Sequence, residues 1–493
     1  MKKSLWQNYK IKSKFKVLDV NKKTDIVIIG GGITGLSTAY NLKDSKYKII
    51  IVDAKDFISS TTCKSTAKIT YLQDLKYSYI QSIYDFNTSK LYYESQKDAI
   101  KLIKKIINDN LIECDLKKTS MITFTCSKKD LNKFKTEKEI LKKLDVNYDD
   151  SLSLVHIENI KDLIMVKNNY TFNPAKYING LLEILKEYDN IDIYKKSMVT
   201  KIKKEDNGYI LYVNNSRIEA KKIVVACSYP FFSLPGFIPL KTYLEKSYLC
   251  ATEVSDVNKY AYISTNKPII SLRYYEDNKN KYVIYLRCAS KISENLNSKK
   301  NYDNCIFNSK KILKKTPSYV WTNMDVMTND HLPLIGKISK TDKNVFIATG
   351  YNTWGMTNGT IAGKIISNLI LGKKSKYFSL FSPTRNLNIK KNINFLKNTL
   401  YTAIKSYSFT LIRKNPSWYK DKTYITKKDG KRVGIHIDSN GNKHMVLNTC
   451  PHLKCHLLYN EVDKTWDCPC HGSRFDIDGN IVKGPSVYNI KYK

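Results

Sequence analysis

A glycine-rich turn between an apolar run and a helical pattern constrains the front of this chain most strongly. Residues 25–29 (Asp-Ile-Val-Ile-Ile) form a short continuous apolar run, which is typical of a buried parallel strand. Residues 30–35 (Gly-Gly-Gly-Ile-Thr-Gly) follow at once, and residues 33–42 have the pattern of a helix. A second apolar run, 49–52, ends at Asp53. This order predicts a βαβ unit in a parallel sheet.

The glycines of this unit match G-x-G-x-x-G, the Rossmann fingerprint of a dinucleotide site. Gly30 permits the tight turn, Gly32 lets the backbone approach a pyrophosphate, and Gly35 allows close packing of helix on strand. The free N–H groups and dipole of the helix start favour the anion. Asp53 is placed to bond the ribose hydroxyls. The expected binding residues here are Gly30, Gly32, Ile33, Thr34, Gly35 and Asp53.

Further segments, in their order and spacing, carry a resemblance to a known family. Residues 59–62 (Ser-Ser-Thr-Thr) with 66–68 look like a second phosphate-proximal loop. Residues 221–226 look like a strand that returns to the dinucleotide domain, and 344–359 look like a C-terminal flavin segment. Together they resemble the glycine-oxidase/D-amino-acid-oxidase (DAO) family over residues 22–372. The resemblance implies FAD as cofactor, with further contacts from Thr61, Thr62, Gly350, Gly355, Met356, Thr357 and Asn358.

The resemblance also implies a fold and a class of substrate. The fold is an α/β FAD/NAD(P)-binding Rossmann-type domain with an inserted α+β substrate domain, and the substrate is a small amine or amino acid. Arg273 falls where relatives build the substrate sheet, and an arginine there suits a substrate carboxylate. An ordinary strand arginine is the alternative. The sequence assigns no catalytic base. Helical patterns run from about 90 to 108, from 129 to 144 and from 174 to 185.

The last fifty residues carry a metal-binding pattern. Cys-Pro-His at 450–452 and Cys-Pro-Cys-His-Gly-Ser at 468–473 form C-x-H … C-x-x-H, a site with mixed sulfur and nitrogen ligands. Zinc accepts two Cys and two His, but its usual spacings are C-x2–4-C and H-x3–5-H. Here each half contains one Cys and one His. Zinc also gives no reason for the second cysteine pair, Cys455 and Cys470.

With that second pair, the pattern resembles the Rieske [2Fe–2S] family, which implies a small all-β domain. The neutral imidazole ligands of such a cluster raise its potential to roughly −150 to +300 mV. Phe475 stands where respiratory Rieske proteins carry Tyr, and Phe cannot donate a bond to a ligand sulfur. This predicts a potential below the respiratory type. The resemblance implies Cys450 and Cys468 on one iron, His452 and His471 on the other, and a Cys455–Cys470 disulfide.

Length and composition bound the organisation of the chain. Its 493 residues exceed a single ordinary core. We expect a DAO-like domain at 1–387, a basic linker helix at 388–415 and the Rieske domain at 416–493. The net charge of +38 comes mostly from evenly spread Lys, and no nucleic-acid-binding motif accompanies it, so no nucleic-acid partner is expected.

Cysteine usage and hydropathy bear on the location of the protein. The cysteines outside the C-terminal pattern have no paired spacing, which is typical of a reducing compartment, so a cytoplasmic location is expected. No signal peptide and no transmembrane segment are expected, because no run reaches about 18 apolar residues.

These patterns predict an FAD-dependent oxidoreductase that passes electrons between a small substrate, a flavin and a Rieske cluster. An unidentified electron donor or acceptor completes the reaction, and the direction of electron flow stays open. The alternative is a flavin/Rieske redox sensor or electron-transfer protein without a small-molecule substrate.

Overall fold

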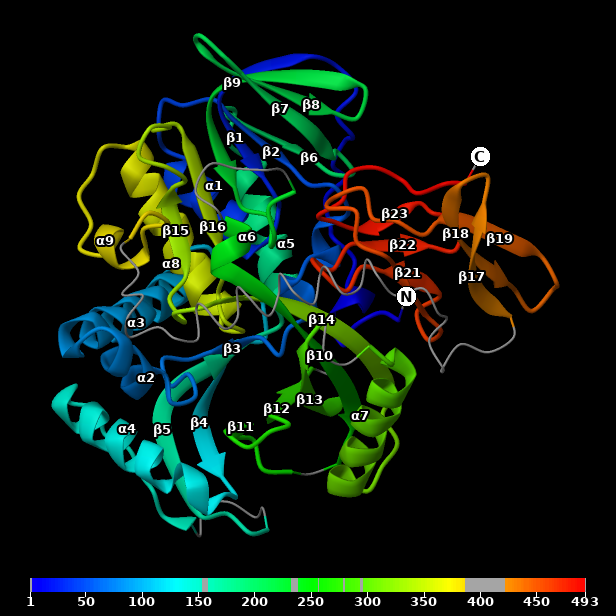
Figure 1. The fold of residues 1–493 in the computed structure, drawn as a ribbon. Coiled ribbons are helices and arrows are strands. Elements are labelled where there is room, and N and C mark those ends of the chain that lie inside the picture. Colours follow the sequence, from blue (N-terminus) through cyan, green and yellow to red (C-terminus); the bar gives the residue numbers. More distant parts are fainter. Residues whose placement is uncertain are drawn as a thin grey trace.

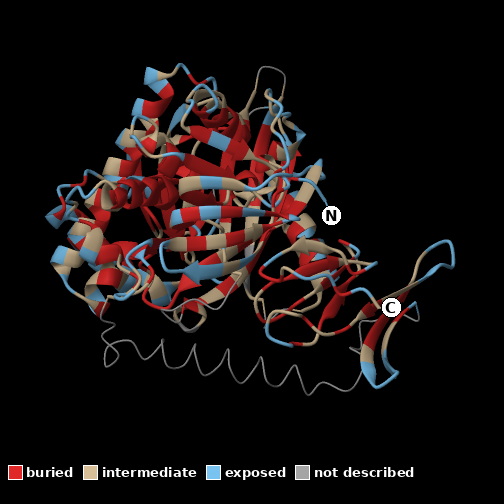
Figure 2. Ribbon diagram, turned by 90° about the horizontal axis from the view of Figure 1, so that it is seen from above, coloured by how far each residue is buried: buried red, intermediate tan, exposed pale blue. Residues whose placement is uncertain are grey.

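Two large sheets form the main body of the protein, and a smaller β domain formed by the C-terminal residues lies beside it (Figure 1). The computed structural model describes residues 2–152, 158–231, 238–255, 257–277, 280–292, 296–385 and 422–492. The expected linker helix at 388–415 lies outside the described residues. Buried residues concentrate in the strands at the centre of the main body (Figure 2).

The first sheet has the order β15-β16-β9-β1-β2-β6, with β7 and β8 attached beyond β9. The apolar runs of the sequence form its central parallel pair, in which Ile26 aligns with Ile49 and Ile29 with Val52. These four side chains are at most 6% exposed, because helices pack against one face of this sheet and strands β7 and β8 pack against the other. The strands are β1 Lys22–Ile29, β2 Ile49–Val52, β6 Ile191–Tyr194, β7 Val199–Glu205, β8 Gly208–Val213, β9 Ser216–Val225, β15 Leu334–Lys337 and β16 Val345–Thr349.

The second sheet has the order β14-β10-β13-β12-β11-β4-β5-β3 and is inserted between segments of the first. It is mostly antiparallel, and β14 forms the edge that faces the C-terminal β domain (Figure 1). The strands are β3 Lys68–Ile69, β4 Lys117–Thr125, β5 Asp162–Thr171, β10 Thr242–Glu253, β11 Ala261–Ser264, β12 Ile270–Glu276, β13 Lys281–Lys291 and β14 Tyr319–Thr328.

Helices cover both sheets, and the helical patterns of the sequence correspond to α1, α3, α4 and α5. Asp85 and Asn173 begin α3 and α5 with side-chain bonds to free backbone N–H groups. The helices are α1 Ile33–Leu42, α2 Lys76–Ile83, α3 Phe86–Asp109, α4 Leu131–Lys143, α5 Pro174–Leu185, α6 Ile238–Lys241, α7 Ser298–Leu313, α8 Gly355–Ile370 and α9 Phe378–Phe381, with short 3-10 turns η1 Leu5–Asn8, η2 Phe57–Ser59, η3 Thr62–Lys64 and η4 Lys128–Asp130.

The C-terminal β domain contains two small sheets. The strands β20–β23 lie against the main body, whereas β17–β19 project away from it (Figure 1). Trp466 and Phe475 are fully buried and pair across β21 and β22 to form the centre of the domain. The strands are β17 Thr423–Lys428, β18 Lys431–Ile437, β19 Lys443–Leu447, β20 Leu458–Asn460, β21 Thr465–Asp467, β22 Arg474–Asp476 and β23 Ile481–Lys483.

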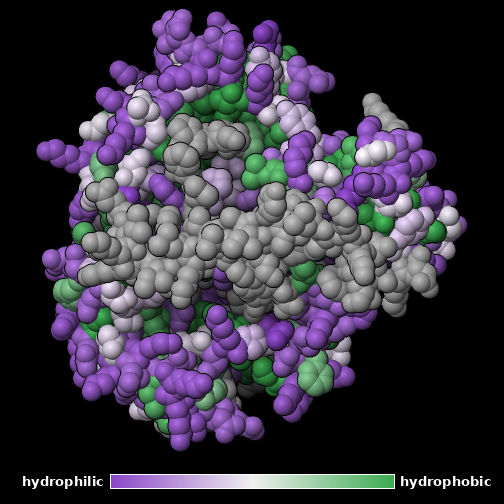
Figure 3. Space-filling model, in the orientation of Figure 1, coloured by the Kyte–Doolittle hydropathy of each residue, from purple (hydrophilic) through white to green (hydrophobic). Residues whose placement is uncertain are grey.

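The surface agrees with a diffuse distribution of charge. Hydrophilic side chains are spread over the visible described face, with no single patch of them (Figure 3). Within the described ranges, no helix has the length and apolar character needed to cross a membrane.

Candidate functional site

A cavity of about 580 Å³ lies where the first sheet, the edge of the second sheet and the C-terminal β domain meet. Its walls come from three sources. The turns after β1, β2 and β16 supply the first, β14 supplies the second, and the loop after β21 together with strand β23 supplies the third. The two regions that the sequence singles out, at opposite ends of the chain, therefore border one space.

The glycine turn after β1 needs its glycines for steric reasons. Gly30 has φ +114°, and a Cβ there would lie 2.9 Å from the carbonyl oxygen of Ala226. A Cβ on Gly35 would lie 1.9 Å from the carbonyl oxygen of Gly30, so helix α1 could not pack against the turn. The carboxylate of Asp53 accepts a bond of 2.8 Å from the backbone N–H of Gly31. Burial raises the pKa of Asp53, and this N–H opposes the shift.

Two helix N-termini face the cavity. Helix α1 begins after Gly32 and α8 begins after Trp354, and neither N-cap residue makes a side-chain capping bond. Gly32 and Thr34 line the cavity at the start of α1, and Gly355 and Met356 line it at the start of α8. Uncapped N–H groups and positive dipole ends suit an anionic ligand. The cavity therefore fits a dinucleotide with its pyrophosphate at α1 and its second ring system at α8.

Most of the sequence-predicted FAD residues are brought together here. The cavity is lined by Gly30, Gly32, Ile33, Thr34, Asp53, Thr61, Thr62, Gly350, Gly355 and Met356, while Gly35, Thr357 and Asn358 lie outside its lining among the described residues. The side chain of Thr357 accepts a bond from Gln73, and Asn358 bonds Gln96 and Tyr92. These buried contacts hold the start of α8 rather than face the cavity.

The four predicted cluster ligands converge at one end of the β domain. The rings of His452 and His471 lie 5.1 Å apart between centroids, and the buried thiols of Cys450 and Cys468 lie close enough to shift each other's pKa. Two tight turns hold them, with the Cys468 N–H bonded to the Ser473 carbonyl at 2.7 Å. The Nδ1 atom of His471 is buried and makes no hydrogen bond to the described residues. This donor set of two sulfurs and two imidazoles fits a Rieske cluster.

A disulfide joins the two ligand turns. Cys455 and Cys470 form it, as the sequence resemblance implies. The sulfur of Cys468 also lies within 4.8 Å of both disulfide sulfurs. The bridge therefore clamps the turns directly beside the ligand positions.

The cluster end of the β domain contacts the main body. His471 and Gly472 line the shared cavity, and the ring of Tyr229 lies 5.7 Å from the ring of His471. Gly472 has φ +73°, and a Cβ there would lie 2.9 Å from the sulfur of Met324 on β14. This close approach leaves room only for glycine at position 472.

A buried polar network fixes the β domain to the main body. Arg474 pairs with Asp463 at 2.7 Å and with Asp467 at 2.8 Å, and both Arg474 and Asp463 are almost fully buried. The main body supplies Tyr302, whose hydroxyl donates to the Asp463 carboxylate at 3.1 Å, and Lys246, 3.6 Å from Asp467. Each buried charge thus has a partner, as buried charges require.

Arg273, the sequence-predicted substrate residue, is not among the residues that line the cavity. It is 1% exposed, and its terminal nitrogens donate to the carbonyl oxygens of Thr66 at 2.5 Å and Phe172 at 2.7 Å. Its guanidinium also lies over the ring of Trp6. These contacts favour a structural role for Arg273, which joins the substrate sheet to the phosphate-proximal loop.

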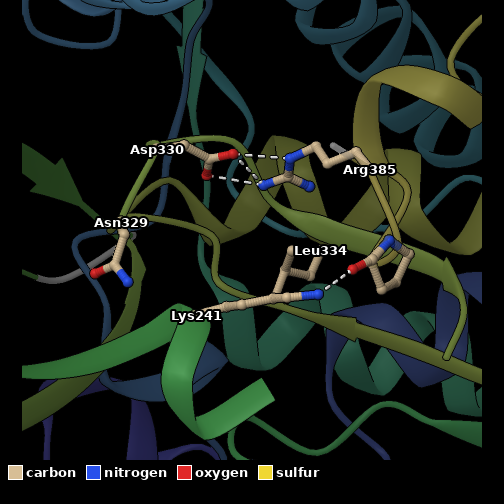
Figure 4. A pocket seen from close by; sticks show the side chains of 6 residues that line it. Lys241, Asn329, Asp330, Leu334 and Arg385 are labelled. Atoms are coloured by element: carbon tan, nitrogen blue, oxygen red, sulfur yellow. Dashed lines mark hydrogen bonds and ion pairs between the residues drawn. The ribbon is translucent and has the colours of Figure 1, made fainter. Parts of the chain in front are cut away.

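A second, much smaller cavity of about 10 Å³ lies between β15 and the segment after α9. Figure 4 shows the Arg385 guanidinium aligned with the Asp330 carboxylate, with both bonds at 2.8 Å. Lys241 points across the cavity and donates to the Pro383 carbonyl at 2.7 Å. The Arg385–Asp330 pair and the Lys241–Pro383 bond fasten the segment that contains Arg385 to the fold.

Several residues of the shared cavity have no signal in the sequence. Asp325 lines it from β14, and Lys483 lines it from β23. A single Asp in a strand and one Lys among many carry no local pattern that marks them. Only the contact between segments far apart in the chain reveals them.

Comparison with known proteins assigns the family. The model of the DAO family, described as FAD dependent oxidoreductase, matches residues 25–369, and that of the Rieske [2Fe-2S] domain matches residues 413–492. The chain therefore belongs to the DAO family of FAD-dependent oxidoreductases and carries a C-terminal Rieske domain. It is an oxidoreductase whose cofactors are FAD and a [2Fe–2S] cluster. The finer domain boundaries, at 387/388 and 415/416, stay predictions.

Relatives and solved structures agree with this architecture. The Rieske 2Fe-2S iron-sulfur protein YhfW of Bacillus subtilis is 29% identical over 97% of this chain and 94% of that protein. The gamma-glutamylputrescine oxidoreductase of Escherichia coli is 19% identical over 74% of this chain and 87% of its own length. The crystal structure of glycine oxidase from Geobacillus kaustophilus superposes with a TM-score of 0.60 at 14% identity, covering 75% of this chain and 100% of that chain.

Proposed function

We propose that this chain oxidises a small amine or amino acid at its FAD and exchanges the electrons with its own Rieske centre. The shared cavity carries the proposal: His471 and Gly472 of the cluster loop line the same space as Gly32 and Met356 of the dinucleotide fold. FAD supplies two-electron chemistry, and a [2Fe–2S] cluster supplies one-electron transfer.

The residues that hold the two groups are part of the proposal. The FAD contacts are assigned to Gly30, Gly32, Ile33, Thr34, Gly35, Asp53, Thr61, Thr62, Gly350, Gly355, Met356, Thr357 and Asn358, the last two through the start of α8. The cluster ligands are assigned to Cys450, His452, Cys468 and His471. Within the protein, Tyr229 and Met324 pack beside the cluster loop.

The class of substrate is supported by Asp325. Among the described residues that line the cavity, Asp53 and Asp325 carry the carboxyl groups. Asp325 belongs to the sheet that relatives use for substrate. A carboxylate there can hold a substrate ammonium group. Burial raises the pKa of Asp325 to about 7, Lys483 lowers it and Glu245 raises it. The names of relatives fit the same class, since one refers to gamma-glutamylputrescine and another to glycine.

An anaerobic substrate screen tests the proposal. Candidate amines and amino acids are added to the reconstituted holoprotein, while flavin absorbance and the Rieske EPR signal are followed together. Flavin bleaching followed by a Rieske signal supports the proposal. No bleaching with any donor, together with a Rieske signal after dithionite, favours a redox sensor or electron-transfer protein without a small-molecule substrate. Absence of a Rieske signal after dithionite contradicts the cluster assignment.

A further inference from the structure

Positive charge gathers where the C-terminal β domain closes over the dinucleotide cavity. Lys55 and Lys64 line the cavity from the main body, just after β2 and at the end of η3. Arg474 and Lys483 line it from the β domain, where they are cross-strand partners on β22 and β23. With Lys196, which lies 4.0 Å from the Asp56 carboxylate, five cations from two domains border one space.

Three of these cations form no ion pair in the described parts of the chain. Arg474 is neutralised by Asp463 and Asp467. By contrast, no carboxylate oxygen of the described residues lies within 4.0 Å of the Nζ atom of Lys55, Lys64 or Lys483. Their main chains are nevertheless anchored. The Lys55 N–H donates to Asp53 at 2.8 Å, and the carbonyl oxygen of Lys64 accepts from Trp321 at 2.9 Å.

The cluster is electrostatically unfavourable without an anion. Burial lowers the pKa of Lys483 to about 7, with contributions from Lys64, Arg474 and Lys55, while Asp325 acts in the opposite sense. Burial likewise lowers the pKa of Lys64 to about 8, with Arg474 and Lys55 in support. Half-buried like charges repel one another and lose hydration. A ligand carrying two negative charges relieves both costs.

The cavity motif indicates which anion this is. The glycine turn and the N-terminus of α1 form one wall of the cavity, and in this motif they contact a pyrophosphate. We propose that Lys483 of the Rieske domain, together with Lys55 and Lys64, binds the pyrophosphate of FAD, so that the Rieske domain completes the cofactor site. The inference rests on FAD binding and does not depend on the identity of the substrate.

This arrangement couples two events. If the docked Rieske domain supplies a cation to FAD, then FAD binding stabilises the docked domain by the same free energy. FAD binding and docking of the Rieske domain are therefore thermodynamically linked. The electrostatic part of that link comes from Lys483, which reaches the cavity across the domain boundary.

The test is a titration of flavin-free protein with FAD, followed by flavin fluorescence. Lys483→Gln, which removes the charge and shortens the side chain by one atom, is expected to raise the Kd for FAD about tenfold, as for the loss of a charge-assisted bond. Lys483→Arg restores the charge and is expected to bind within about twofold of the parent protein. Riboflavin, which has no phosphate, is expected to bind the parent and the Gln variant equally.

Controls separate this result from damage to the fold. Lys443→Gln removes the same charge from an exposed position on β19 and should leave the Kd for FAD unchanged. If Lys483→Gln does not keep its Rieske EPR spectrum, Lys64→Gln provides a second variant, in the main body. It is expected to raise the Kd for FAD by the same amount and to leave the Kd for riboflavin unchanged. An unchanged Kd for FAD overturns the proposal. So does an equal loss for riboflavin, or a raised KM for substrate with the Kd for FAD unchanged.

Discussion

The ring of Tyr229 lies 5.7 Å from the ring of His471, which itself lies 5.1 Å from the ring of His452. Tyr229 follows β9, and Ala226 at the end of that strand contacts the turn at Gly30. A short series of packed residues therefore joins the dinucleotide turn to the cluster ligands. Because both sites belong to one chain, transfer between them needs no encounter of two molecules.

Asp325→Asn tests the substrate side of the cavity. Removal of the carboxylate is expected to raise KM for a cationic amine about tenfold, since a charge-assisted bond is lost. In the parent protein, KM should fall as pH rises through about 7, because the Asp325 carboxyl, which faces Lys483 and Glu245, becomes ionised there. In the variant this pH dependence should vanish. Asp206→Asn, on the exposed turn between β7 and β8, is the control; an unaltered pH profile in Asp325→Asn contradicts this role.

The pH dependence of FAD binding follows from the cation cluster. In flavin-free protein the pKa of Lys483, which faces Lys55, Lys64, Arg474 and Asp325, is about 7. The pyrophosphate of bound FAD carries two negative charges, so it favours the protonated form of the Lys483 amine. Affinity for FAD is therefore greatest below about pH 7 and falls as pH rises and Lys483 loses its proton. Fluorescence titrations from pH 6 to 9 measure this, and affinity that is flat across this range in the parent protein speaks against the cluster.

Lys483→Arg provides the matched comparison for that pH series. Arginine keeps its charge across the range, so its affinity for FAD should decline less with pH than that of the parent protein. Equal slopes for the two proteins would show that another group titrates.

Tyr302→Phe tests the docking network. Loss of the hydroxyl leaves the buried Asp463 carboxylate without one of its donors, which is expected to cost about 1–3 kcal/mol. Thermal unfolding followed by the visible absorbance of the Rieske centre measures the loss. Tyr212→Phe on β8, a half-buried tyrosine outside the lining of the shared cavity, should leave that transition unchanged. Equal transitions in both variants would mean that Tyr302 does not hold the domain.

Phe475→Tyr tests how the chain sets the cluster potential. Phe475 is fully buried beside the ligand turns, and Tyr would add a donor that bonds a ligand sulfur. One hydrogen bond of about 1 kcal/mol corresponds to roughly 40 mV for a one-electron couple, so the midpoint should rise by that order. An EPR-monitored redox titration measures it, and an unchanged midpoint would refute the interpretation of Phe475.

Local patterns predicted the parts of the molecule that local physics determines. The run that ends at Ile29 had to become a buried strand, and Gly35 had to be glycine because the Gly30 carbonyl fills the space of a side chain. The Cys455–Cys470 disulfide likewise follows from the motif spacing of its family. In each case the pattern that marks the feature lies within a few tens of residues.

Contacts between residues that lie far apart in the chain could not be predicted from the sequence. Asp463 and Tyr302 meet across 161 residues, and no periodicity records that bond. The sulfurs of Cys250 and Cys305 lie 3.2 Å apart although their spacing matches no motif. The scarcity of arginine and the place of Arg273 in a strand suggest a substrate contact, but its burial against Thr66 and Phe172 depends on tertiary packing. The docking position of the Rieske domain could not be predicted either, because it depends on the complementarity of two folded surfaces.

The central claim is that electrons pass between substrate, flavin and cluster within one chain. Stopped-flow mixing of anaerobic holoprotein with a substrate from the screen, followed at flavin and Rieske wavelengths, tests it most directly. We expect the cluster to change oxidation state after the flavin, with a first-order rate that does not vary over a tenfold range of protein concentration. A rate that rises in proportion to protein concentration, or a cluster that stays oxidised while the flavin is fully reduced, would contradict it.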